Sequence, residues 1–295
     1  MTTVTPPRRV ILLTSASTYR DEAFLAAARG LDLEVVRVLD MPEQLSEHYE
    51  VRLAVDFSKP ERAAAQIAAL ARQEPVAAIL SVDDAATELA ALANELAGLP
   101  ANDPHAARAA RDKYVMRSQL AAGGVKTPWF KVAPADRNPA EVAEQVEYPC
   151  VVKPRRLSGS RGVIRADNPE EFATAFTRLR TILTGDGEDV AQATILVEEY
   201  LPGDEVAVEG LLTDGELHVL AIFDKPDPLE GPFFEETIYV TPSRHSARTQ
   251  RAIADEVAAS AHALGLRHGP IHAELRVRDE RAWLLEVAGR SIGGL

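Results

Sequence analysis

Strand-type and helix-type segments alternate through the first hundred residues, and this alternation restricts the fold more than any other feature. Short apolar runs at residues 10–15, 33–39 and 76–82, with a weaker one at 51–57, predict strands. Helical patterns cover residues 21–29, 60–73 and 85–97. Such spacing predicts a parallel sheet with helices packed on it. Because GxGxxG and GxxxxGK[ST] are absent from the sequence, neither a dinucleotide site nor a P-loop is expected.

The remaining two thirds of the chain are organised differently. A single helix is expected over residues 104–122, and shorter ones over 139–146, 169–183 and 249–264. Strands are expected at 150–153 and 195–197, followed by a hairpin of 205–213 with 216–223 around Asp214-Gly215. Residues 224–245 hold four prolines and predict a long functional loop. A chain of 295 residues exceeds one typical core, so we expect domains at 1–100, 101–193 and 194–295.

Charge and cysteine content narrow the classes of partner and compartment. A net charge of -13 argues against nucleic acid, whose phosphates require a basic surface, but leaves room for a small nucleotide. No run approaches the roughly 18 apolar residues of a membrane helix, so no membrane partner is expected. Cys150 is the only cysteine, which rules out an internal disulfide and favours core packing over a nucleophilic role. A cytoplasmic location is expected.

The last predicted hairpin, residues 270–278 with 282–290, carries the sharpest chemical signal. On its second strand, residues 283, 285 and 287 would share the apolar face. If the apolar faces of both strands meet one core, a three-residue turn at 279–281 sets Glu274 directly opposite Glu286. Facing carboxylates are destabilising unless something offsets their charge, and Mg²⁺ shared with substrate phosphates is the natural candidate. The alternative is a pair of solvated glutamates on an edge hairpin. Arg290 shares their face of the strand.

Two further segments are open to more than one interpretation. Lys153 is followed by a loop rich in serine, glycine and arginine at residues 154–162, which predicts either a phosphate-binding loop or a basic surface turn. The acidic connector at 198–205 is either a solvated linker or a contact for a purine edge and ribose hydroxyls. Taken alone, Lys113 is a surface lysine, and His272 is either buried or a substrate contact.

In their order along the chain, five segments resemble the motifs of the ATP-grasp superfamily, above all its carboxylate–amine ligases that act on amino acids. They are Asp112-Lys113 before GGVKTP, VVKPRRLSGSRGV, VEEYLPGDEVAVEG, GPIHAEL and LLEVAGRSIGGL. The resemblance implies a mixed α/β and α+β protein with the ATP-grasp fold. An N-terminal Rossmann-like domain with a parallel sheet would precede two α+β lobes that clasp ATP.

The resemblance also implies roles for individual residues. Lys113 and Lys153 would contact the ATP phosphates, and Lys153 and Arg290 would be the catalytic pair. The nucleotide would further meet a mobile lid and a connector, made of Ser158, Gly159, Ser160, Gly162, Glu198, Glu199, Tyr200, Leu201 and Glu205. Glu274 and Glu286 would hold Mg²⁺. Candidates for the second substrate's amine or carboxylate are Glu235, Glu236 and His272.

The implied activity is amide or peptide bond formation through an acyl phosphate, with release of ADP and phosphate, on small carboxylate and amine substrates. The alternatives are a biotin-carboxylase-like or purine-pathway enzyme using bicarbonate or formate, and a non-catalytic ATP-binding module. Ala288 stands where the family commonly has a metal-binding asparagine, so the number of Mg²⁺ ions is open. Relatives usually continue beyond the last motif, so a further C-terminal segment is expected. The sequence leaves the oligomeric state open, and a homodimer is one arrangement that it allows.

Overall fold

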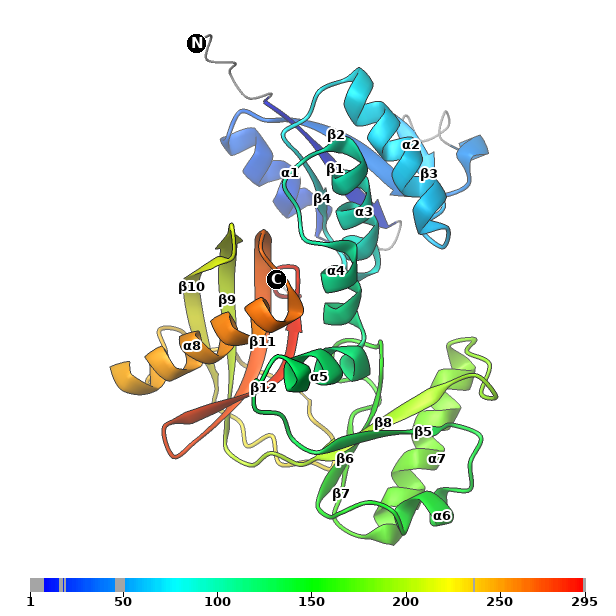
Figure 1. Cartoon of the computed structure of the whole chain (residues 1–295), viewed down its shortest axis with the longest axis vertical. Coiled ribbons are helices and arrows are strands. Elements are labelled where there is room, and N and C mark those ends of the chain that lie inside the picture. The colour runs from blue at the N-terminus through cyan, green and yellow to red at the C-terminus, as the bar shows by residue number, and fades with distance from the viewer. Residues whose placement is uncertain (1–7, 16–17, 19, 46–50, 236, 294–295) are drawn as a thin grey trace.

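A computed structural model describes residues 8–15, 18, 20–45, 51–235 and 237–293. Within these residues the strands form three four-stranded sheets, which occupy separate parts of the molecule (Figure 1). One sheet is built from the first hundred residues, and the other two come from the rest of the chain.

The first sheet is parallel throughout and has the strand order β3-β2-β1-β4. Its strands are β1 (Arg9–Ser15), β2 (Glu34–Asp40), β3 (Leu53–Val55) and β4 (Ala78–Ser81). Between and after them lie α1 (Asp21–Gly30), η1 (Glu43–Leu45), α2 (Pro60–Gln73), η2 (Asp84–Ala86) and α3 (Thr87–Ala97). Ile11, Ile67 and Leu89 join strands and helices in one core. The predicted parallel sheet is confirmed.

The single helix expected over residues 104–122 is wrong, because two helices meet at Asp112. They are α4 (Pro104–Arg111) and α5 (Lys113–Ala122). Asp112 has extended backbone angles, and its carboxylate accepts hydrogen bonds from the N–H groups of Tyr114 and Val115. An aspartate in this role begins a new helix, so the chain turns and Lys113 becomes the first residue of α5.

The second sheet is antiparallel and has the order β5-β8-β6-β7. Its strands are β5 (Phe130–Pro134), β6 (Cys150–Pro154), β7 (Ile164–Ala166) and β8 (Thr194–Glu199), and α6 (Pro139–Ala143) and α7 (Pro169–Gly185) belong to the same unit. Phe172, Phe176 and Leu179 of α7 pack on one face of the sheet. Strands β5 and β7 were not predicted, since they are short and carry weak apolar patterns.

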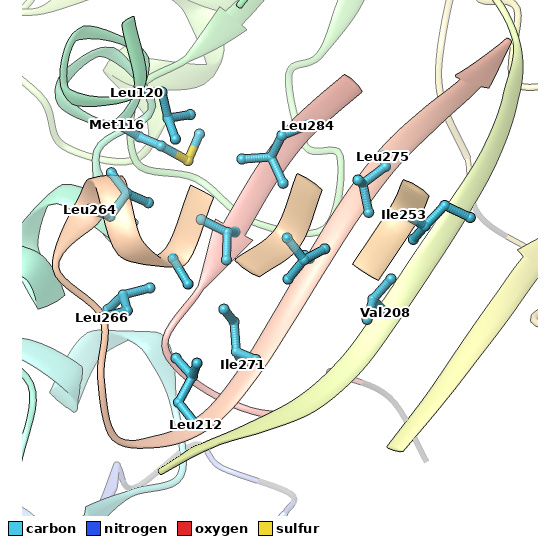
Figure 2. Packing of buried hydrophobic residues seen from close by; sticks show 14 of the residues in the cluster. Met116, Leu120, Val208, Leu212, Ile253, Leu264, Leu266, Ile271, Leu275 and Leu284 are labelled. Atoms are coloured by element: carbon cyan, nitrogen blue, oxygen red, sulfur yellow. The ribbon is translucent and has the colours of Figure 1, made fainter. Parts of the chain in front are cut away.

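The third sheet is antiparallel, with the order β10-β9-β11-β12. Its strands are β9 (Asp204–Thr213), β10 (Glu216–Lys225), β11 (Gly269–Arg278) and β12 (Arg281–Ala288), and α8 (Ala247–Leu264) covers it. Figure 2 shows Ile253 and Leu264 of α8 packed with Leu275 and Leu284 of the sheet. The hairpin predicted around Asp214-Gly215 is confirmed, with both turn residues at positive φ.

The turn of the last hairpin differs from the expected one. Arg278 pairs with Arg281, so the turn has two residues, Asp279 and Glu280, both at positive φ. This register alone would not place Glu274 opposite Glu286. A β-bulge on β12 corrects it, because the pairing shifts by one residue between Leu284 and Glu286. The predicted pairing of Glu274 with Glu286 is therefore confirmed, but the predicted three-residue turn is wrong.

The bulge also changes which side chains of β12 face the core. We expected residues 283, 285 and 287 to share the apolar face. Leu284 and Val287 instead lie in the core, on opposite sides of the bulge. Within the part of the chain described, no helix has the length and apolar character needed to cross a membrane. The expected domain boundaries after residues 100 and 193 stay a prediction.

Candidate active site

A cavity of about 440 Å³ lies between the two antiparallel sheets and the start of α5. Most of the predicted site residues line it: Lys113, Lys153, Ser158, Gly159, Ser160, Glu198, Glu199, Tyr200, Leu201, Glu205, His272, Glu274, Glu286 and Arg290. They come from five separate stretches of sequence, so the fold brings together motifs that are far apart in the chain. Cavities of this size hold small organic ligands.

The paired carboxylates meet on the side of the cavity formed by β11 and β12. Glu274 and Glu286 are opposite each other in the ladder, and each contacts a lysine. Lys225 Nζ lies 3.0 Å from Glu274 Oε1, and Lys113 Nζ lies 3.1 Å from Glu286 Oε2. Burial alone would raise the pKa of Glu274, but His272 and Lys225 outweigh it and hold that pKa well below its usual range. Each of the two carboxylates is therefore paired with a lysine at the cavity.

A buried charge cluster forms the opposite wall. Glu198, at the end of β8, contacts Lys153 of β6 and accepts hydrogen bonds from Arg117 of α5 at 3.0 and 3.3 Å. All three side chains are almost completely buried. Burial tends to raise the pKa of Glu198, but Arg117 and Lys153 lower it to about 2. Glu198 thus places the Lys153 ammonium at the cavity. The Glu198 carboxylate itself is already bonded to Lys153 and Arg117.

Lys113 ties the loop after β6 to α5. Its ammonium donates to the carbonyl of Leu157 at 2.8 Å, just before Ser158, Gly159 and Ser160. Gly159 and Ser160 have positive φ, which gives the loop its sharp turn over the cavity.

We expected the three arginines of this loop to add positive charge to the cavity, but they do not. Arg155 and Arg156 contact Asp112, at 2.5 and 3.4 Å, and Arg161 pairs with Asp186 at 2.6 Å. Asp112 attracts the first two because its carboxylate is buried and caps α5. The positive charge at the cavity comes instead from Lys113, Lys153, Arg276 and Arg290.

Glu205, the expected ribose contact, is held in an internal network. Lys225 Nζ lies 2.7 Å from its Oε1 and Arg276 Nη2 lies 2.9 Å from its Oε2. Burial is the main cause that raises the pKa of Glu205, with Glu274 adding to it. Lys225 therefore bridges Glu205 and Glu274 at the floor of the cavity.

His272 is buried between two carboxylates. Its Nδ1 lies 2.5 Å from Glu209 Oε1, and its Nε2 lies 3.5 Å from Glu274 Oε1. Burial alone would lower the pKa of His272, but the hydrogen bonds to Glu209 and Glu274 raise it to about 9. The expected substrate contact lies within the cavity lining, where its ring contacts these two acids.

The raised pKa of His272 predicts a loss of stability in alkaline solution. The stabilisation from the charged imidazole is complete below the unfolded-state pKa of about 6.5, and disappears as the pH rises through about 9. The free energy of unfolding should therefore fall by up to about 3 kcal/mol over this interval. Denaturant titrations in metal-free buffer at pH 6.5 and 9.5 measure it. His272→Gln should remove most of the difference, and an equal pH dependence in both proteins would contradict the assignment.

Arg290 lies at the junction with the first sheet. Its Nε is 2.7 Å from Asp84 Oδ1 in η2, and its side chain is mostly buried. The following residue, Ser291, accepts a hydrogen bond at 2.5 Å from Arg20, whose side chain also donates to the carbonyl of Val82. The N-terminal unit thus fixes the orientation of Arg290 at the cavity.

Two predicted residues lie away from this cavity. Gly162 lies beyond the main cavity, where a Cβ would be 2.8 Å from Leu179 Cδ1. Glu235 is exposed and borders a neighbouring surface pocket. Glu236 lies outside the described residues. Cys150 is buried, which raises the pKa of its thiol to about 12, as expected for a core residue and not a nucleophile.

Sequence reasoning missed several polar residues of this site: Asp84, Arg117, Lys225 and Arg276. Two of them left a usable signal. Arg117 lies four residues after Lys113 and therefore on the same face of a helix, and Arg276 lies two residues after Glu274 and therefore on the same face of a strand. Asp84 and Lys225 meet their partners across long stretches of sequence, which no local pattern reports.

Comparison with known families identifies a match over half of the chain. The ATP-grasp domain family matches residues 146–295. Alanine–anticapsin ligase of Bacillus subtilis (strain 168) is 28% identical over 255 residues, which cover 81% of this chain and 53% of that protein. D-alanine–D-alanine ligase of Aromatoleum aromaticum is 30% identical over 182 residues, covering 60% of this chain and 55% of that protein. The chain thus spans about half the length of these relatives.

A solved structure resembles nearly the whole chain. The L-amino acid ligase from Bacillus licheniformis aligns with a TM-score of 0.75 and 27% sequence identity, covering 97% of this chain and 68% of that one. The likeness extends over all three sheets, including the N-terminal one that lies outside the family match.

Proposed function

The chain belongs to the ATP-grasp family, and we propose that it is an ATP-dependent ligase that joins a carboxylate to an amine, with amino acids as substrates. The carboxylate would attack the γ-phosphate of ATP to give an acyl phosphate and ADP, and the amine would then displace phosphate to form an amide. The observation that carries the proposal is one cavity lined by two lysines, two arginines and two facing carboxylates. The names of the similar ligases support the same reaction class.

The cavity fits a metal–nucleotide complex better than a metal alone. Among the described residues, no group of three His, Cys, Asp or Glu side chains is placed to hold a metal ion by itself. Mg²⁺ characteristically takes one or two carboxylates and completes its coordination with phosphates and water. Glu274 and Glu286 supply such oxygens, and Ala288 offers none. A bound Mg²⁺ would neutralise charge on the phosphates, and one ion is the number that these ligands favour.

The apolar part of the cavity would hold the base. Val151, Tyr200, Leu201, Phe234 and Leu285 line it. The N–H groups of Glu199 and Tyr200 already donate to the carbonyls of Trp129 and Pro149, so the base edge would meet other groups of this connector. Glu205 would accept hydrogen bonds from the ribose hydroxyls through the carboxylate lone pairs that Lys225 and Arg276 do not use.

The chain's own residues would mainly place the reactants and balance charge, as in phosphoryl transfer generally. Lys113 and Lys153 would contact the phosphates, and the loop at Ser158, Gly159 and Ser160 would close over them. Arg290, oriented by Asp84, would stabilise the transferred phosphoryl group. A closed loop protects an acyl phosphate from water. Glu235, Glu236 and His272 stay candidates for the second substrate, together with the loop that contains the first two.

The experiment is a panel assay of ADP release with Mg²⁺, using pairs of amino acids and, separately, bicarbonate and formate. We expect stimulation by one or more amino-acid pairs. Stimulation by bicarbonate alone would favour the carboxylase alternative. ATP binding without ADP release on the whole panel would favour a non-catalytic module. A homodimer, which we also propose, is tested by light scattering on the same sample.

A further inference from the structure

Arg117 is the buried group that joins the two walls of the cavity. It lies one turn after Lys113 on α5, and none of its surface is exposed. Its guanidinium contacts Glu198 on the second sheet at 3.0 and 3.3 Å. It also donates to two carbonyls on the third sheet, to Leu284 at 2.9 Å and to Leu285 at 2.7 Å.

The two carbonyls belong to the β-bulge of β12. The pairing runs from Leu284 to Glu286 and skips Leu285, and β12 lies at the edge of its sheet. Leu285 lines the apolar part of the cavity, whereas Leu284 points into the core near Met116 and Leu120 of α5 (Figure 2). Arg117 therefore satisfies the bulge and fixes the side on which Leu285 emerges.

The other partner, Glu198, directly precedes the connector at 199–201 that lines the same part of the cavity. Arg117 thus sets the spacing between this connector and Leu285, which approach the cavity from different sheets. A planar guanidinium can bond a carboxylate and two carbonyls at once, and a lysine ammonium cannot reproduce this geometry.

We infer that Arg117 is a positioning residue for the nucleotide base, acting through Glu198 and through the bulge at Leu285 without touching the ligand. This inference rests on the proposed ATP-binding function. It assigns Arg117 to the part of binding that depends on the base, whereas Lys113 and Lys153 would hold the phosphates.

The test compares ATP with tripolyphosphate, which has the phosphates but no base. Dissociation constants are measured by displacement of a fluorescent ATP analogue, with Mg²⁺ present, for the wild-type chain and Arg117→Lys. We expect the variant to bind ATP at least about tenfold more weakly and tripolyphosphate within twofold of wild type. The matched control is Arg108→Lys, because Arg108 pairs with Glu88 outside the cavity. It should change neither dissociation constant.

Other outcomes overturn the inference. If Arg117→Lys weakens both ligands equally, the residue supports the whole site and not the base. If it weakens neither, the contacts to the bulge are dispensable. If wild-type protein binds no ATP, the proposed function fails, and the inference fails with it.

A second variant decides the question if Arg117→Lys does not fold, as judged by circular dichroism. Arg117→Met keeps most of the side-chain volume, removes every bond of the guanidinium to the two walls, and leaves the contact between Glu198 and Lys153 in place. It should again weaken ATP more than tripolyphosphate, and equal weakening would overturn the inference.

Discussion

Replacing Lys153 with methionine is expected to lower the rate of ADP formation by about 10²–10³-fold, the usual cost of removing one preorganised group that stabilises developing charge. Lys153 lies at the end of β6, almost fully buried, with its ammonium held by Glu198. Methionine keeps most of the side-chain volume, so the core of the second sheet should be preserved. Arg117 stays as a partner for Glu198.

The rate is measured by coupled ADP release with the best substrates from the panel. Lys59→Met is the matched control, since Lys59 is an exposed lysine that pairs with Asp56 in the N-terminal unit. Control activity should equal wild type. Near-normal turnover in Lys153→Met, with an unchanged melting temperature, would remove Lys153 from the site.

Replacing Glu286 with glutamine is expected to remove most of the Mg²⁺ dependence of ATP binding. Glu286 faces Glu274 across the β11–β12 ladder, and its carboxylate lies at the cavity with Lys113. Glutamine keeps the shape but supplies a neutral oxygen, which is a weaker ligand for a hard dication. Affinity for ATP in excess Mg²⁺ should fall at least about tenfold, a change of about 1.4 kcal/mol.

ATP titrations at a series of Mg²⁺ concentrations measure this effect. Glu216→Gln provides the control, because Glu216 is an exposed residue of the same sheet at the start of β10. Glu274→Gln should weaken the Mg²⁺ dependence similarly, and the double variant should add less than the sum, since both residues would bind one ion. A Glu286→Gln protein with wild-type Mg²⁺ dependence would contradict the assignment of this carboxylate to the metal.

Local patterns predicted the elements of this protein well, because alternation and turn residues act over short distances. The parallel sheet of the first hundred residues and the hairpin at Asp214-Gly215 follow directly from such patterns. Asp112 shows the limit: a continuous helical pattern did not reveal that its carboxylate begins a second helix. Helix propensity indicates whether a residue can be part of a helix. Here the capping contact of Asp112 determines where the second helix begins.

One feature of the site, the facing carboxylates, was also predicted from a local pattern. The facing of Glu274 and Glu286 was expected from the requirement that both apolar faces meet one core. The pairing is confirmed, but Leu284 and not Leu285 packs in that core. The route was different, since a two-residue turn and a bulge together give the same pairing. A one-residue insertion is invisible in the pattern until the partner strand is known.

The charges of the site depend on contacts between distant residues. Arg155 and Arg156 carry charge next to the cavity loop, yet Asp112 binds both. No motif singled out Arg117 or Lys225, yet these two residues organise the buried acids. Ion pairs in a buried site form between groups that are close in space. Nearness to a motif in the sequence therefore did not identify the charged residues that contact the buried acids.

The acyl-phosphate mechanism is tested most directly by tracing an oxygen atom from the carboxylate substrate to the released phosphate. The amino acid that supplies the carboxylate is labelled with ¹⁸O and incubated with ATP, Mg²⁺, the amine substrate and the protein, and the phosphate released is analysed by mass spectrometry. If the carboxylate attacks the γ-phosphate, each phosphate formed with ADP carries one labelled oxygen. Formation of ADP with unlabelled phosphate would show that water and not the carboxylate takes the phosphoryl group, and would contradict the proposed ligase mechanism.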